Sequence, residues 1–260
     1  MVTDTEAIVL RQVKTLNGRR MLLLFSRKFG KISVGTSITE GGKNKSALAV
    51  RPFTYGRYEL FKGRDSYSLN SGQVIESFYS LGEDLDKYMA GSYVLELTEK
   101  LLADDLPQPR MFALLLDFLN TLEKRSKKHD TLVMAYMVKV LDIMGTMPEL
   151  DSCCVCGCRG ADRFFSVSGG GMMCAECARA AAEDTEAKAK SKAKANEPLI
   201  YDTNFGIVNI LKYFQKEPMS TFGKIALDEG ILKELRAILK SYLAYHLDVG
   251  KLKSEDFIIN

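Results

Sequence analysis

Hydrophobic and polar residues alternate along the first 75 residues, with the two-residue period of half-buried β-strands. Turn-forming pairs such as Asn17-Gly18 and Phe29-Gly30 separate the apolar runs. Five short strands in so short a stretch predict a small β-barrel of the OB or SH3 type. The expected strands cover residues 7–13, 20–25, 31–35, 54–61 and 66–69.

The apolar spacing changes to the helical period after residue 80. Helices are expected over residues 83–103, 111–124 and 131–144, and two more near 203–215 and 228–247. Pro107 and Pro109 break the first from the second, and Gly145 ends the third. The sequence therefore predicts a strand-rich domain at residues 1–80 and a helical domain at residues 81–260.

Two short cysteine pairs interrupt the helical region, Cys153-x-x-Cys156 and Cys174-x-x-Cys177. Seventeen residues separate the pairs, a spacing typical of a structural zinc ribbon in which each pair supplies two thiolates. Gly157 follows the first pair, where a knuckle favours a residue that tolerates positive φ. The glycines at 169–171 predict the turn of a short hairpin. We expect one structural zinc ion in a module at about residues 150–178.

Two further cysteines, Cys154 and Cys158, leave other ligand pairs open, and disulfides or free thiols are the alternatives to a metal. We prefer Cys153 and Cys156 because Cys-x-x-Cys-Gly is the tighter knuckle. A closed four-thiolate site has no open position for water or substrate, so the expected metal role is structural.

The overall composition indicates no special class of protein, whereas the charge of the first domain points to a kind of partner. The content of 46% hydrophobic and 27% charged residues is ordinary for a globular protein. Residues 1–72 hold 13 Lys/Arg against 5 Asp/Glu, a balance of +8, whereas the rest of the chain holds 23 against 28, a balance of −5. A basic barrel on an acidic remainder favours a polyanionic partner such as nucleic acid.

Basic side chains and rings in the barrel provide the candidate DNA-binding residues. A cationic groove with aromatic rings binds single strands in OB-folds. Phe53, Tyr55 and Tyr58 are candidate stacking faces, although some rings must fill the barrel core. The candidate cations are Arg11, Lys14, Arg19, Arg20, Lys43, Lys45, Arg51 and Arg57. The lysines between 188 and 194 fit a solvated helix or tether better than a phosphate site.

The sequence carries no convincing catalytic constellation, so we expect a protein that is not an enzyme. His129 and His246 are the only histidines, and neither lies near a nucleophile motif. The loop around Lys43 fails as a phosphate loop because Ser37 stands at the first glycine position and Asn44 at the Ser/Thr position. No apolar run spans a membrane, and the polar N-terminus is unlike a signal peptide. With clustered cysteines, this favours a reducing, cytoplasmic location.

Several short segments, in this order, resemble the RecO family of bacterial recombination mediators. They are Ala7-Ile-Val-Leu10, Phe29-Gly30-Lys31, Lys43-x-Lys45 with Arg51-Pro52-Phe53, Phe78-Tyr-Ser-Leu81, Gly145-x-x-Pro148-x-Leu150, the cysteine pairs with Gly169-Gly170, and Tyr242-Leu-x-x-His-Leu247 with Lys253-Ser254. The resemblance covers most of the chain. It implies an α+β multidomain fold, with an N-terminal OB-fold β-barrel and an α-helical domain that carries an inserted zinc ribbon.

The resemblance also implies a function in DNA repair and recombination. Such a protein binds single- and double-stranded DNA and anneals complementary strands. Its implied partners are RecR and the C-terminal tail of single-stranded DNA-binding protein, and it helps load RecA near the bacterial nucleoid. The main alternative is a zinc-ribbon adaptor in transcription or translation without annealing activity. A metal-dependent nuclease is disfavoured because no carboxylate or histidine cluster is visible for catalytic metals.

Overall fold

A computed structural model describes residues 1–14, 20–38, 45–64, 66–126, 128–190, 199–203 and 206–257. The chain forms two compact units, the first comprising Met1–His129 with Lys251–Asn260, and the second Asp130–Gly250. The change from strands to helices falls near residue 80, as the sequence predicts, but the first two long helices belong to the same unit as the barrel.

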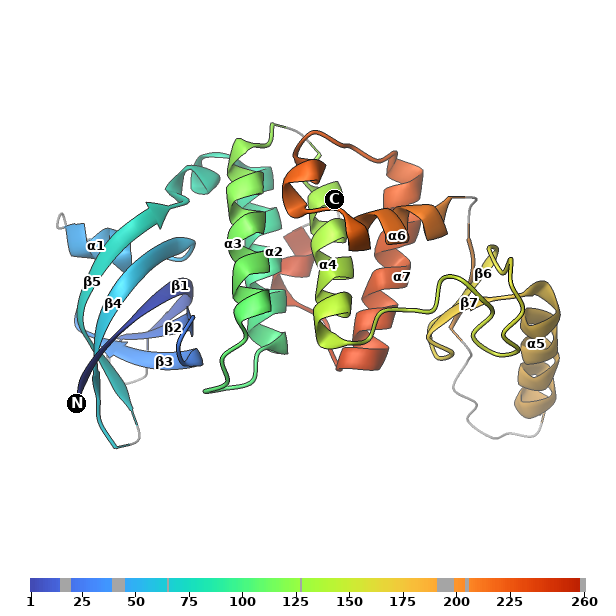
Figure 1. Cartoon of the computed structure of the whole chain (residues 1–260), viewed down its shortest axis with the longest axis horizontal. Helices are drawn as coiled ribbons and strands as arrows, with labels where there is room; N and C mark the ends of the chain where they lie inside the picture. The colour runs from blue at the N-terminus through green and yellow to red at the C-terminus, as the bar shows by residue number, and fades with distance from the viewer. Residues whose placement is uncertain are drawn as a thin grey trace. The chain divides into compact units, whose positions relative to one another are not determined.

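The first unit contains a closed five-stranded barrel in the order β1-β2-β3-β5-β4 (Figure 1). All neighbouring strands are antiparallel except β3 and β5, which run parallel through the pairs Val34–Tyr67 and Gly35–Ser68. The predicted fold class, a β-barrel of the OB type followed by helices, is confirmed. The elements are β1 (Val2–Lys14), β2 (Arg20–Ser26), β3 (Gly30–Thr36), α1 (Lys45–Ala49), β4 (Thr54–Lys62) and β5 (Tyr67–Ser77).

Strand β5 is longer than its sequence pattern predicts, because Gly72 lies within the strand and not in a turn. Gly72 pairs with Tyr58 of β4, and a side-chain carbon at this glycine would lie 3.1 Å from the Cβ of Ala49 and 3.3 Å from the Tyr58 ring. The missing side chain therefore allows β5 to pass over the packed ring. The predicted turn at Asn17-Gly18 lies outside the described residues.

Apolar residues from all five strands and α1 fill the barrel. Tyr58 is completely buried, and its hydroxyl donates a 2.7 Å hydrogen bond to the Ala49 carbonyl. Burial also raises the pKa of Tyr58, which keeps the phenol neutral. The core members are Ala7, Val9, Leu22, Leu24, Ile32, Val34, Ala49, Val50, Tyr58 and Leu60.

Two helices, α2 (Leu85–Leu101) and α3 (Pro109–Lys124), complete the first unit with the short turns η1 (Tyr79–Glu83) and η3 (Lys253–Phe257). Asp84 caps α2 by accepting hydrogen bonds from the backbone N–H groups of Asp86 and Lys87. The ring of Phe112 on α3 packs edge-on against Phe25 of the barrel, with centroids 5.2 Å apart. The helices thus continue the hydrophobic packing of the barrel.

The turn between β2 and β3 depends on Gly30, which has a φ of +74°. A side chain here would place its first carbon 2.2 Å from the Leu106 carbonyl oxygen, so only glycine permits the close approach of the loop between α2 and α3. Lys31 holds the same loop through a 3.2 Å ion pair with Asp104 and by accepting the backbone N–H of Asp105. The barrel and the helices are therefore connected at this turn.

The second unit is built around α4 (Asp130–Met144), α6 (Ile207–Lys216) and α7 (Glu229–Leu247), with η2 (Met219–Gly223). Nearly every side chain of α4 from Thr131 to Leu141 is buried, as expected for a central helix. Arg236 of α7 forms a 2.7 Å ion pair with Asp130 at the start of α4. A carboxylate at this position also interacts favourably with the positive end of the helix dipole.

The cysteine module belongs to this second unit. Strands β6 (Phe164–Ser166), β7 (Gly171–Met173) and β8 (Ile200–Asp202) form a sheet in the order β7-β6-β8, and α5 (Ala175–Lys190) begins directly after Cys174. The predicted glycine-rich hairpin is therefore present as β6 and β7. The ring of Phe165 packs on Tyr242 of α7 at 5.7 Å, and His246 Nε2 lies 2.7 Å from the Val167 carbonyl oxygen. These contacts anchor the module to α7.

In the part of the chain that the structure describes, every helix is too short or too polar to cross a membrane.

Candidate functional site

Four thiols of the cysteine module converge on one point, with their sulfur atoms all within 4.8 Å of one another. The sulfurs of Cys156 and Cys174 are 3.8 Å apart. A tetrahedral ion with metal–sulfur bonds of about 2.3 Å holds its ligands about 3.8 Å apart. All six cysteines are free thiols. The cluster of Cys153, Cys156, Cys158 and Cys174 can therefore hold a metal ion, and an all-sulfur donor set suits a soft, thiophilic one.

The first pair lies in a knuckle closed by backbone hydrogen bonds. The Gly157 N–H donates to the Cys153 carbonyl, and Gly157 has the positive φ, +75°, that the sequence predicts. The Cys174 N–H points at the Cys153 sulfur from 3.4 Å. The Ala178 N–H donates to the Cys174 carbonyl, which starts α5 at the second pair. Both pairs are thus positioned by the chain itself.

The backbone also prepares thiolates. Burial opposes ionisation of Cys153, yet the N–H groups of Cys156, Cys174 and Val155 outweigh it and lower the pKa of Cys153 to about 6. The N–H of Cys177 is the main cause that lowers the pKa of Cys174. Because the thiolate is the form that binds metals, these N–H groups favour the ligand state at neutral pH.

The position of Cys158 is the main difference from the sequence-predicted ligand set. Cys158 lies in the tight cluster, whereas the fourth predicted ligand, Cys177, hydrogen-bonds the thiols of Cys174, Cys156 and Cys153 from the first turn of α5. Five thiols are thus available for four positions. Cys154 lies apart and directs its sulfur to the Gly171 carbonyl at 3.8 Å.

Several of the predicted DNA-binding cations are paired with carboxylates of their own unit. Arg11 binds Glu99 at 2.7 Å, and Arg57 lies 3.8 Å from Glu6, a carboxylate that Arg27 also binds at 3.0 Å. Each of these arginines keeps about half or more of its side chain exposed, so phosphates can still compete for them. Their charge is nevertheless partly screened by the protein.

The structure describes four of the other predicted cations, Lys14, Arg20, Lys45 and Arg51. Lys14 and Arg20 face each other across β1 and β2, and Arg20 also approaches the Gln12 side-chain oxygen at 3.4 Å. The Arg51 guanidinium lies over the Tyr79 ring, 5.3 Å from its centroid. Lys45 begins α1. Arg19 and Lys43 lie outside the described residues.

The candidate stacking rings are a correction, because Phe53, Tyr55 and Tyr58 are all buried. Phe53 fills the space left by Gly91 of α2, and Tyr55 packs against Phe112 while donating its hydroxyl to Glu6. These rings pack the first unit, so they cannot stack on bases. The two histidines also have structural positions, since His129 is buried and His246 contacts the cysteine module.

Sequence reasoning missed three cations that gather at one end of the barrel, Lys28, Lys62 and Arg64. Lys28 comes from the β2–β3 turn, and Lys62 and Arg64 come from the end of β4 and the turn that follows it, which is far away in sequence. The only signal was the general excess of positive charge. In contrast, the predicted lysine run from 188 begins at the end of α5 and continues into residues outside the described ranges.

Comparison with known proteins gives one consistent result. The family model "Recombination protein O N terminal" matches residues 1–78, and "Recombination protein O C terminal" matches residues 82–256. The "DNA repair protein RecO" of Pelotomaculum thermopropionicum is 32% identical over 254 residues, which cover 97% of this chain and 92% of the relative.

Two further relatives carry the same name. The "DNA repair protein RecO" of Alkaliphilus metalliredigens is 30% identical, with 95% of each chain covered. That of Thermoanaerobacter sp. (strain X514) is 28% identical, with 98% of this chain and 96% of the relative covered. Together with the closed barrel, the helical unit and the clustered cysteines, these matches show that the chain belongs to the RecO family of DNA repair proteins.

Proposed function

We propose that this protein is a DNA repair and recombination mediator that binds single- and double-stranded DNA and anneals complementary strands without catalysing a reaction. In this proposal it also helps load RecA onto single strands coated with single-stranded DNA-binding protein. The observation that carries the proposal is the closed barrel of the OB type, made by the segment in which the positive charge is concentrated. Its membership of a DNA repair family supports the same conclusion.

Annealing needs no covalent chemistry, only two polyanions held together with their bases free to pair. Lys and Arg side chains contact phosphates without reading the bases, so a basic surface can position two strands at once. Local carboxylates already bind Arg11 and Arg57. Exchange of these carboxylates for phosphates would make binding weak, reversible and salt-sensitive, which suits a protein that must release the annealed product.

We further propose that the cysteine module holds one structural zinc ion through Cys153, Cys156, Cys174 and Cys177. The sulfur-only donors and the lowered pKa of Cys153 support this assignment. Bound zinc would supply rigidity to a module with a very small sheet. The ribbon and the helices would then provide docking surfaces for RecR and for the tail of single-stranded DNA-binding protein, in the cytoplasm where the chromosome lies.

Annealing of complementary oligonucleotides tests this function directly. The wild-type protein should accelerate pairing with no nucleotide present, and annealing should persist over short times in EDTA because magnesium is not a reactant. Strict dependence on ATP hydrolysis would contradict the proposal. Failure both to bind and to anneal DNA would favour the zinc-ribbon adaptor instead.

The salt dependence of binding tests the predicted cations. Replacing Lys43, Lys45 and Arg51 together with Ala should flatten the slope of log affinity against log salt, by about 0.7 for each lost single-strand phosphate contact. An unchanged slope and affinity would move the DNA surface elsewhere, first to the lysines between 188 and 194.

A further inference from the structure

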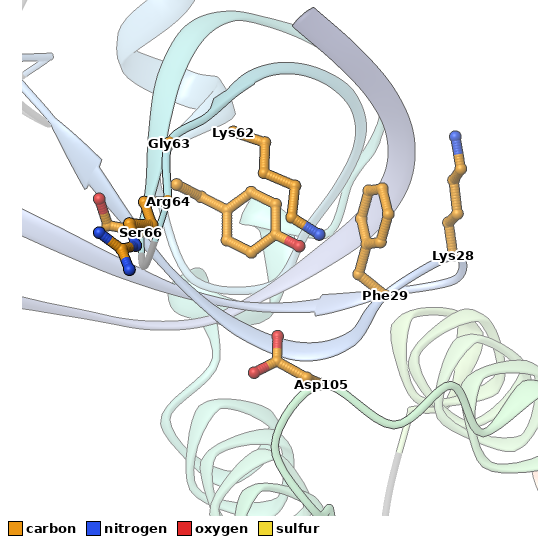
Figure 2. Close-up of a pocket in the computed structure, with 8 residues that line it drawn as sticks. Lys28, Phe29, Lys62, Gly63, Arg64, Ser66 and Asp105 are labelled. Carbon is orange, nitrogen blue, oxygen red and sulfur yellow. The ribbon is translucent and has the colours of Figure 1, made fainter. Parts of the chain in front are cut away.

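A small pocket of about 320 Å³ opens at the end of the barrel, where the β2–β3 turn meets the β4–β5 turn (Figure 2). Two aromatic rings, three cations and one carboxylate contribute to it. The lining residues are Lys28, Phe29, Lys62, Gly63, Arg64, Ser66, Tyr67 and Asp105. This combination suits a ligand that is both flat and anionic.

The rings are held in place by the barrel. Phe29 and Tyr67 are half-buried, pack against the barrel core and lie 5.6 Å apart with an angle of 39° between their planes. Tyr67 pairs directly with Lys62 across β4 and β5, and the Phe29 N–H donates to the Ser26 hydroxyl at 2.9 Å. The rings therefore present fixed apolar surfaces at the pocket, with little conformational entropy left to lose on binding.

The cations are placed over these rings. The Lys62 ammonium lies 5.4 Å from the Tyr67 centroid and 5.8 Å from that of Phe29, and Lys28 lies 5.2 Å from Phe29. Figure 2 shows Lys62 directed toward Phe29, with Lys28 and Arg64 at opposite ends of the pocket. An anion that enters between these groups would meet positive charge from several directions.

These cations differ from Arg11 and Arg57 in their partners. Lys28 donates a hydrogen bond to the Thr3 hydroxyl at 3.3 Å, and within the described ranges Lys28, Lys62 and Arg64 have no carboxylate partner. Asp105 contributes one negative charge at the wall, in a left-handed backbone conformation with φ of 55°. Among the described residues, the lining therefore carries an excess of two positive charges.

We propose that this pocket binds one unpaired nucleotide of a DNA strand, with its phosphate on Lys62 and Arg64 and its base against Phe29 and Tyr67. The inference rests on the proposed DNA-binding function and adds the subsite that distinguishes single from double strands. A base in a duplex has both faces covered by its neighbours, so only an unpaired base can use the rings. The pocket is at the small end of ligand sites, with room for one nucleotide.

The charges are tested with the double variant Lys62→Ala/Arg64→Ala. Its matched control, Lys224→Ala/Lys233→Ala, removes the same charge from exposed positions in the second unit. Binding to a fluorescent dT oligonucleotide and to a blunt duplex of the same length is measured between about 50 and 200 mM salt. Over this range, affinity that depends on phosphate contacts falls steeply. The pocket variant should lower the single-strand salt slope by about 1.4, and the control should not.

The rings are tested with Phe29→Leu and Tyr67→Leu, which keep the apolar bulk against the barrel core. The probe is a single strand with abasic sites, which keeps every phosphate and lacks bases. The wild type should prefer the dT strand over the abasic strand, and each ring variant should reduce that preference about fivefold or more. An equal preference in wild type and variants would overturn the stacking assignment.

Asp105→Asn should change the affinity in the opposite direction, since it removes the one carboxylate among the described lining residues. Asparagine also tolerates the left-handed backbone conformation of this position. Single-strand affinity should rise about two- to threefold at low salt, which a misfolded variant could not produce.

If the wild type binds DNA and the pocket variants match the control, the pocket proposal fails and the proposed function stands. If the wild type binds no DNA, the proposed function itself fails. Binding of an Asp/Glu-rich peptide is measured with the same variants. If the pocket variants lose binding to this peptide and keep wild-type binding to DNA, the DNA proposal is wrong and the pocket binds an acidic protein tail.

Discussion

The barrel and the cysteine module are organised by different physical means. The barrel closes five strands around ten buried core residues, and its neighbouring strands pair antiparallel except β3 and β5. The module has three strands of three residues each and brings its chain together at a cluster of thiols. Hydrophobic burial is sufficient for the first, and the second requires a cross-link that the thiols can supply through a metal.

Because the barrel is held by a hydrophobic core and the module by clustered thiols, charged groups serve different purposes in the two regions. In the barrel, a stable core allows the surface to carry cations such as Lys62 and Arg64, which have no carboxylate partner in the described part of the chain and line a pocket. In the module, four thiols converge on one point, and backbone N–H groups favour the thiolate form of Cys153 and Cys174 there. The barrel is therefore the region expected to contact DNA, and the module the region expected to stabilise the helical unit.

Loss of the metal should have the largest effect, and it should be confined to the second unit. Cys174→Ser removes a thiol whose sulfur lies 3.8 Å from that of Cys156 and within 4.8 Å of that of Cys153, so we expect loss of the bound metal and unfolding of residues 150–178. Metal analysis and hydrogen exchange measure the two effects. Cys154→Ser is the control, because the Cys154 sulfur lies apart from the cluster. Full metal content in Cys174→Ser would contradict the ligand assignment.

A second pair of variants tests whether Cys177 or Cys158 is the fourth metal ligand. We expect Cys177→Ser to lose the metal and Cys158→Ser to keep it, because the spacing of the two Cys-x-x-Cys pairs assigns two ligands to each pair and Cys177 lies beside Cys153, Cys156 and Cys174. The measurement is the zinc-to-protein ratio after dialysis, with a competing chelator to compare affinities. The reverse result would assign the site to Cys153, Cys156, Cys158 and Cys174.

Strain at Gly30 should affect the barrel unit and leave metal content unchanged. Gly30→Ala forces a side chain into the Leu106 carbonyl at positive φ, so we expect destabilisation by about 2 kcal/mol or more. Denaturant unfolding followed through barrel amides measures the loss. Gly82→Ala is the matched control, since a side chain there meets nothing within 4 Å. Equal stability of the two variants would mean that the loop near Leu106 is not held as closely as described.

The smallest effect concerns pH, and it belongs to the barrel unit. Burial lowers the pKa of His129, and its Nδ1 has no hydrogen-bond partner among the described residues. Because the folded-state pKa lies below the unfolded value of about 6.5, this neutral histidine contributes stability above that pH, and the contribution is lost as pH falls through the folded-state pKa.

Thermal melts between pH 7.5 and pH 5 should therefore show a steeper loss for the wild type than for His129→Gln, by about 1 kcal/mol or less. The comparison is made between the slopes, because the substitution itself changes the absolute stability. Parallel curves for the two proteins would show that another group governs the pH dependence.

Much of the fold could be predicted from local patterns. Periods of two and 3.6 residues located the barrel strands and the helices that became α2, α3, α4, α6 and α7, because each element buries one face. The cysteine spacing predicted a knuckle, and Gly157 has the positive φ that the knuckle requires. These features depend on residues close together in sequence.

The burial of individual rings, the pairing of charges and the full set of clustered thiols could not be predicted, because they depend on how the chain folds in three dimensions. The sequence made Phe53, Tyr55 and Tyr58 candidates for stacking while requiring some rings in the barrel core, and the folded unit buries all three. The pairing of Arg11 with Glu99 joins residues 88 positions apart, which no local pattern can indicate. The same holds for Cys158, which the fold of the knuckle turned toward the cluster.

The order of strands and helices, the cysteine pairs and the positive charge of the first 72 residues follow from composition and short-range periodicity. The folded chain adds which cations are paired with carboxylates and which rings are buried. It also brings Lys28, Lys62 and Arg64 together around two rings at one end of the barrel. The reason is physical: the parallel pairing of β3 with β5 brings two distant turns together, and the energy of a charge depends on the groups that this pairing places beside it.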